Sequence, residues 1–80
     1  MVNKIKQFRF HAGITQAELA ESCGWEGSQS RIANYETSLR VPSLNDMRTI
    51  VSALNASGCE CSIDDVFPPN VEHASNLASA

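Results

Sequence analysis

The apolar residues of this 80-residue chain recur at spacings of three and four, which is the period of an amphipathic α-helix. They favour helices over about residues 3–12, from Thr15 to Gly24, over 28–36 and over 43–54, with a short fifth turn at 63–67. The clearest stripe lies in the fourth segment and comprises Leu44, Met47, Ile50, Val51 and Leu54. The alternation typical of a strand is not evident. The pattern therefore predicts an all-α fold, a compact bundle of about five short helices.

Polar residues mark the expected helix starts. Thr15, followed three residues later by Glu18, has the spacing of a capping box. The same S-x-x-D spacing recurs at 43–46 and at 62–65, and Ser28 is the next plausible N-cap. Because each of these residues precedes an apolar stripe, the capping signals and the periodicity predict the same elements.

Composition narrows the class of protein. Hydrophobic residues make up 42% and charged residues 19%, as in ordinary globular domains. No apolar run approaches the roughly 20 residues of a membrane span, and the first residues lack the apolar core of a signal peptide, so we expect a cytoplasmic protein without a membrane partner. Cys23, Cys59 and Cys61 form no C-x-x-C pair, which predicts free thiols and no metal site. The sequence contains neither a phosphate-binding loop nor a nucleophile motif. We therefore expect no enzyme activity, no cofactor and no small-molecule ligand.

The net charge of −3 is unevenly divided along the chain. Residues 1–40 hold five basic and four acidic residues, a balance of +1, whereas residues 41–80 hold one basic and five acidic residues, a balance of −4. A domain that neutralises few phosphates binds DNA with little sequence-independent affinity. If the chain binds DNA, we therefore expect its N-terminal half to face the duplex.

Residues 15–36 are the segment most informative about function. They indicate two short helices joined at Gly24, a residue suited to a left-handed turn, with a polar outer face on the second helix. Such a pair can place one helix in the major groove while its neighbour crosses the phosphates. Gln and Asn can bond adenine through two atoms, and Arg can do so with guanine.

Five blocks of the chain together resemble the phage Cro/CI-type helix-turn-helix repressors: Ile5–Arg9, Gly13–Ala20, Ile32–Glu36, Arg40–Ser43 and Asp64–Phe67. The resemblance covers about residues 4–67, and the joint occurrence of the blocks is specific. It implies a lambda-repressor-like fold and a phage or prophage repressor that binds a pseudo-palindromic operator as a homodimer. The chain departs from the family spacing by about two extra residues between Gly24 and Ile32, which Gly27 is placed to absorb.

The resemblance also suggests roles for individual residues. The recognition helix, 28–36, would read bases, and Gln16 would contact a phosphate. Arg9 and Glu36 would form a partly buried ion pair that braces this helix against the first. Basic side chains near this face make Arg40, Lys4 and Lys6 further phosphate candidates. The base readers expected on the outward face are Gln29, Ser30, Arg31 and Asn34.

Several alternatives remain open at the level of sequence. Residues 1–69 form the expected DNA-binding domain, and 70–80 a flexible tail or the start of a linker to a further domain of a longer repressor. We expect a dimer surface at 57–68, which contains several apolar residues. Trp25 is expected to pack in the core, and Phe10 on the tail or a partner. An antitoxin that binds a toxin and regulates its own gene through the same helices is the alternative function.

Overall fold

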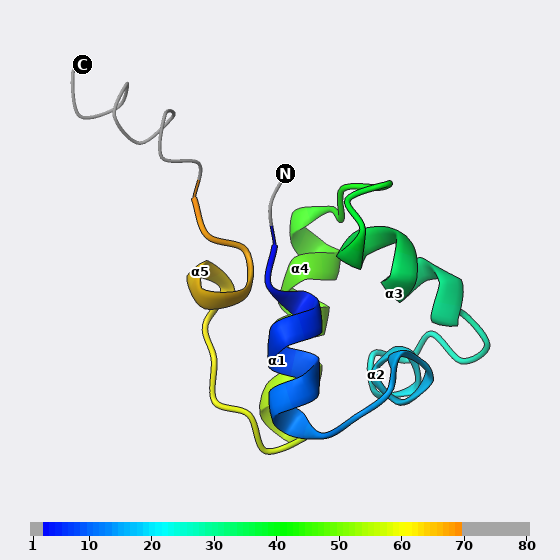
Figure 1. Cartoon of the computed structure of the whole chain (residues 1–80), viewed down its shortest axis with the longest axis horizontal. Helices are drawn as coiled ribbons and strands as arrows, with labels where there is room; N and C mark the ends of the chain where they lie inside the picture. The colour runs from blue at the N-terminus through cyan, green and yellow to red at the C-terminus, as the bar shows by residue number, and fades with distance from the viewer. Residues whose placement is uncertain (1–2, 70–80) are drawn as a thin grey trace.

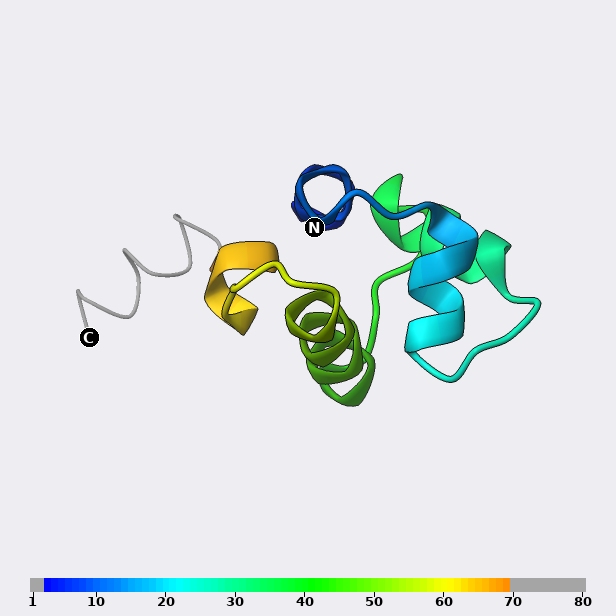
Figure 2. The ribbon, with the colours of Figure 1, turned by 90° about the horizontal axis from the view of Figure 1, so that it is seen from below.

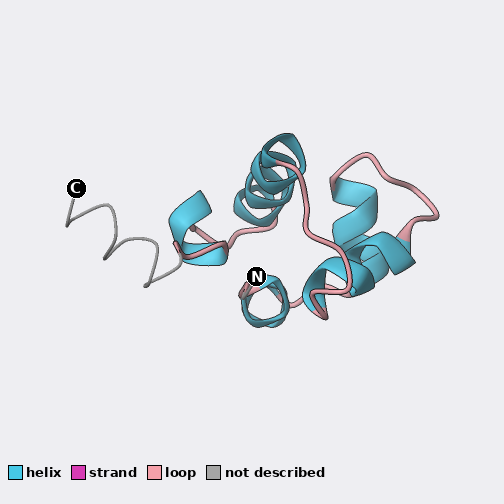
Figure 3. Ribbon diagram, turned by 90° about the horizontal axis from the view of Figure 1, so that it is seen from above, coloured by secondary structure: helices cyan, strands magenta, loops and turns pink. Residues whose placement is uncertain are grey.

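A computed structural model describes residues 3–69, and these form helices without any strand (Figure 3). The predicted all-α bundle of five short helices is confirmed. The expected tail at 70–80 lies outside the described residues. In chain order the helices are α1 (Ile5–Ala12), α2 (Gln16–Ser22), α3 (Gln29–Glu36), α4 (Leu44–Ala56) and α5 (Ile63–Val66).

Helix α4 is the centre of the bundle, because α1, α2 and α5 all pack against it (Figure 1). Helices α2 and α3 pack on each other at one end of the molecule, and α5 lies at the opposite end (Figure 2). Every helix contributes at least one side chain to the core, and each fully buried aliphatic side chain contributes roughly 1.5–3 kcal/mol. The fully buried large side chains are Ile5, Leu19, Ile32, Ile50, Leu54 and Val66.

The capping box predicted at α2 is present in both halves. The Thr15 hydroxyl accepts from the Glu18 N–H at 3.1 Å, and the Glu18 carboxylate accepts from the Thr15 N–H at 2.9 Å. The pair Ser62–Asp65 repeats this arrangement at α5. At α4, Ser43 accepts from the Asp46 N–H at 3.1 Å. In all three N-caps the backbone is extended, which points the hydroxyl at the first turn.

Ser28 is the N-cap residue of α3 as predicted, but the hydrogen bond expected from its side chain is absent. Ser28 precedes α3, but its side chain makes no capping hydrogen bond. Its ψ of 41° is far from the extended value of an ordinary N-cap, so the hydroxyl does not meet the first turn. The Arg31 N–H instead bonds the Ser28 carbonyl at 3.0 Å. Helix α3 therefore starts without a side-chain cap.

Asn3 fixes the start of α1, although nothing in the sequence indicated this role. The helix begins at Ile5, two residues later than expected, and the Asn3 side chain accepts from the Ile5 N–H at 3.2 Å. The amide of Asn3 also donates to the Tyr35 carbonyl at 2.7 Å. Asn3 thus ties the beginning of α1 to the end of α3. Nearby, the Lys4 N–H donates to the Val66 carbonyl at 2.7 Å and joins α1 to α5.

The lengthened turn between α2 and α3 closes in two steps. Gly24 has a φ of 80°, and the Trp25 N–H reaches the Ala20 carbonyl at 2.8 Å, as in the Schellman motif. Gly27 then takes a second left-handed conformation, with a φ of 76°, just before α3. Residues with a side chain rarely adopt a positive φ. Glycine at both positions therefore lets the chain change direction twice within four residues. The extra residues are therefore accommodated outside the two helices.

Trp25 packs against the core as expected, with its ring edge-to-face on Tyr35 at 6.3 Å between centroids. The dimer surface expected at 57–68 rested on apolar residues that the structure places inside the domain. Cys59, Val66 and Phe67 are buried against the core. Because α5 packs on α4, these three side chains contact the core of their own domain, whereas Cys61 is half-buried, and a dimer surface at 57–68 stays a prediction.

Candidate nucleic-acid interface

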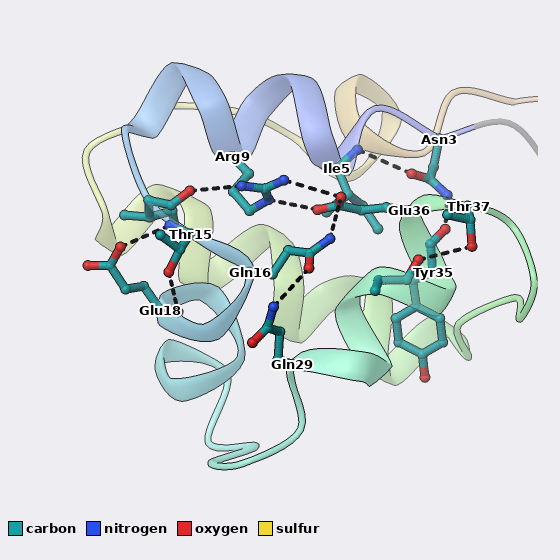
Figure 4. A network of polar contacts seen from close by, with 12 residues as sticks. Asn3, Ile5, Arg9, Thr15, Gln16, Glu18, Gln29, Tyr35, Glu36 and Thr37 are labelled. Carbon is teal, nitrogen blue, oxygen red and sulfur yellow. Dashed lines mark hydrogen bonds and ion pairs between the residues drawn. The ribbon is translucent and has the colours of Figure 1, made fainter.

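A chain of hydrogen bonds links three helices at the end of the molecule formed by α2 and α3 (Figure 4). The Arg9 Nε of α1 meets the Glu36 Oε2 of α3 at 2.7 Å, and Arg9 also donates to the other carboxylate oxygen at 3.3 Å. The Gln16 amide of α2 donates to that second oxygen at 3.1 Å. The Gln29 amide then donates to the Gln16 carbonyl oxygen at 3.3 Å. The Arg9–Glu36 pair expected from the sequence is thus joined in one network to Gln16 and Gln29, which were predicted in other roles.

The ion pair at one end of this network is buried, whereas the glutamine at the other end is exposed. The side chains of Arg9 and Glu36 are only 8% and 4% exposed, and Arg9 also donates to the Ile14 carbonyl at 3.1 Å. Gln29, by contrast, is exposed. A buried, geometrically fixed ion pair therefore holds Gln16, which in turn holds an exposed amide at the first turn of α3. Such an arrangement presents a polar group in a defined position without requiring it to be ordered on binding.

The remaining predicted residues of this end line a depression on the surface of α3 and the loop that follows it. Ser30 and Arg40 are exposed, and Asn34 is half-buried. The Arg40 N–H donates to the Asn34 carbonyl at 3.2 Å, which holds the loop against the helix. The residues that line the depression are Ser28, Ser30, Arg31, Asn34, Tyr35 and Arg40. Uncharged polar side chains and two arginines, Arg31 of α3 and Arg40 of the loop, therefore share a surface.

Arg31, the fourth predicted reader, makes contacts within the domain. Its guanidinium donates to the Asp46 carboxylate of α4 at 2.7 Å and to the Tyr35 hydroxyl at 3.4 Å. It also lies over the ring of Trp25, at 3.9 Å from the centroid. The Tyr35 hydroxyl donates to the same Asp46 oxygen at 2.7 Å. Nothing in the sequence indicated Asp46 as a partner, because its spacing from Ser43 already accounted for it as a helix-start residue.

The two predicted lysines lie at the start of α1. Lys4 is exposed at the start of α1, where its backbone bonds Val66 of α5. Lys6 lies over the ring of Phe10, at 5.7 Å, and Arg9 stacks on the same ring at 4.7 Å. Phe10 is 63% exposed and packs in no core position. The lysines therefore place positive charge along α1.

The electrostatics of this end are set by paired charges. The Arg31 guanidinium hydrogen-bonds Asp46 and holds the pKa of that carboxyl below its usual range. Burial raises the pKa of the Cys23 thiol to about 11, so this cysteine stays protonated at neutral pH. All three cysteines are free.

Within residues 3–69, no helix is long and apolar enough to cross a membrane, and no metal-binding group of acidic, His and Cys residues is found.

Two short helices, α2 and α3, are joined by a lengthened turn, and the second has a polar outer surface. The family described as "Helix-turn-helix domain" matches residues 1–62, more than three quarters of the chain. Comparisons with curated proteins and with solved structures give no match. The extent of the family match and the arrangement of α2 and α3 show that this chain belongs to the helix-turn-helix domain family, a family of DNA-binding regulatory domains.

Proposed function

We propose that this chain is a sequence-specific transcriptional regulator of the Cro/CI repressor type, in which two copies bind a pseudo-palindromic operator and exclude RNA polymerase. Helix α3 enters the major groove, and α2 crosses the phosphates. In a symmetric pair, the two recognition helices lie about one DNA turn apart, roughly 34 Å.

One observation carries the proposal, the hydrogen bond between Gln16 and Gln29. It joins the first residue of α2 to the first residue of α3 at 3.3 Å. A glutamine at the start of a recognition helix offers the paired donor and acceptor that adenine requires. Gln16 fixes the direction of that amide, while Arg9 and Glu36 fix Gln16 from inside the domain. A contact on the phosphates through Gln16 and a contact on a base through Gln29 would therefore share one rigid support.

The proposed readers are Gln29, Ser30 and Asn34, whose side chains carry no charge. Arg31 is left out because its guanidinium is bonded to Asp46. Gln16 and Arg40 flank the readers and are the proposed phosphate contacts. The phosphate contacts of Lys4 and Lys6 stay predictions. Each well-formed two-atom base contact contributes about 1–3 kcal/mol of discrimination against the wrong base.

Selection of bound sites from random duplex DNA tests this function. We expect the wild type to enrich a palindrome and to bind the recovered duplex with two chains per site, as measured by analytical ultracentrifugation. Gln29→Ala should relax the preference at one position in each half-site and weaken binding by about 1–3 kcal/mol per half-site. Gln7→Ala, at an exposed glutamine of α1, is the matched control and should enrich the wild-type site. A folded wild type that enriches no sequence would overturn the proposal.

A further inference from the structure

The contacts of Asp46 differ from those of the acidic residues at the two other capped helix starts. The carboxylates of Glu18 and Asp65 return to the backbone N–H of their own N-caps. That of Asp46, at the corresponding position of α4, accepts from Arg31 and from the Tyr35 hydroxyl, both at 2.7 Å. The carboxylate thus leaves its own helix and bonds two residues of α3.

Arg31 is held from three directions. Asp46 accepts from one terminal nitrogen, Tyr35 approaches the Nε, and the Trp25 ring lies beneath the guanidinium at 3.9 Å. Its side chain is nevertheless 38% exposed, against 14% for that of Asp46, and it lines the same depression as Ser30 and Asn34. The guanidinium is therefore at the edge of the proposed reading surface, close enough to reach a duplex if the carboxylate released it.

We infer that Asp46 withholds Arg31 from DNA, so that the side chains of α3 contribute affinity through matching bases rather than through an additional phosphate contact. The inference rests on the proposed function. An arginine contributes to DNA affinity through any nearby phosphate, whatever the sequence, whereas amides and hydroxyls that face base edges contribute when the bases match. Pairing with Asp46 removes this sequence-independent contribution and leaves Gln29, Ser30 and Asn34 to discriminate.

The same cluster also contacts the lengthened turn between α2 and α3 through Trp25. Trp25 is held between Tyr35 and Arg31, so both Asp46 partners of α3 also contact the turn. Asp46 therefore positions Arg31, and Arg31 in turn lies against the ring of the turn residue Trp25.

The salt dependence of binding to a non-operator duplex tests the inference. A fluorescent 20-base-pair duplex of mixed sequence is titrated with each variant in 0.05–0.5 M KCl. Asp46→Asn frees Arg31 and should steepen the slope of log K against log salt by about 0.9 for each bound chain, the contribution of one phosphate contact, so that affinity falls about eightfold more per bound chain across that range. The double variant Asp46→Asn/Arg31→Gln should return to the wild-type slope.

Two further variants separate the explanations. Asp64→Asn removes the same charge from an exposed position of α5, at the opposite end of the molecule, and should leave the slope within about 0.3 of wild type because it adds no phosphate contact. Arg31→Gln in the native background should also leave the slope unchanged, which tests the inference even if Asp46→Asn fails to fold. Equal slopes for Asp46→Asn and Asp64→Asn, or a shallower slope for Arg31→Gln, would overturn the inference alone. A wild type that binds no duplex at any salt concentration would overturn the proposed function as well.

Discussion

Replacement of Arg9 by methionine is expected to destabilise the domain strongly, because it leaves a buried carboxylate without its cation. Arg9 and Glu36 meet at 2.7 Å with side chains only 8% and 4% exposed. The substitution removes two hydrogen bonds to Glu36 and one to the Ile14 carbonyl, and it leaves the carboxylate with the Gln16 amide. Removing one partner of a buried ion pair typically costs about 3–5 kcal/mol.

This cost is a large share of the stability of a chain of 80 residues, which is about 4–12 kcal/mol at the usual 0.05–0.15 kcal/mol per residue. Urea unfolding followed by circular dichroism should therefore show a much lower midpoint for Arg9→Met, and a similar decrease for Glu36→Leu. The double variant Arg9→Met/Glu36→Leu should lie far closer to wild type, because apolar side chains avoid the desolvation of a lone charge. We expect a coupling free energy of about 3 kcal/mol between the two sites.

Arg48→Met, at an exposed arginine of α4, is the matched control and should change the stability by no more than about 0.5 kcal/mol. Single-variant losses below about 1 kcal/mol, or a double variant that loses the sum of the two single costs, would refute the reasoning. In either case the pair would be worth no more than a surface ion pair.

Two further predictions concern ionisation. The pKa of Asp46 is lowered in the folded state by Arg31, so this carboxylate stabilises the fold above its unfolded pKa of about 3.9, and the contribution is lost as the pH falls below that value. Urea midpoints measured from pH 7 to pH 2 should therefore fall less steeply for Asp46→Asn than for wild type, and an equal slope would contradict this. The pKa of Cys23 is about 11, so its alkylation by iodoacetamide at pH 8 should be slow in the folded protein and rapid in urea, as followed by mass spectrometry; fast labelling without urea would contradict the buried thiol.

The local features of the fold were predictable from the sequence because the groups that make them lie within a few residues of one another. The capping box of Thr15 and Glu18 and the left-handed turn at Gly24 need only contacts between near neighbours in the chain. The apolar stripe of α4 was predictable in part, since helical periodicity places Ile50 and Leu54 in the core, but Leu44 at the start of the helix is 56% exposed. Ser28 is the exception, because the direction of the lengthened turn, rather than the residue type, decides its backbone angle.

The sequence by itself determined that this chain forms five short helices and that 15–36 is a helix-turn-helix segment, because periodicity and capping are local properties. The tertiary structure decided which partner each polar side chain takes. In the folded domain Gln16 bonds Gln29, and Asp46 bonds Arg31 instead of its own N-cap. The apolar residues at and around α5 that had suggested a dimer surface are mostly buried. These choices depend on distances between helices far apart in the chain, which spacing along the sequence does not encode.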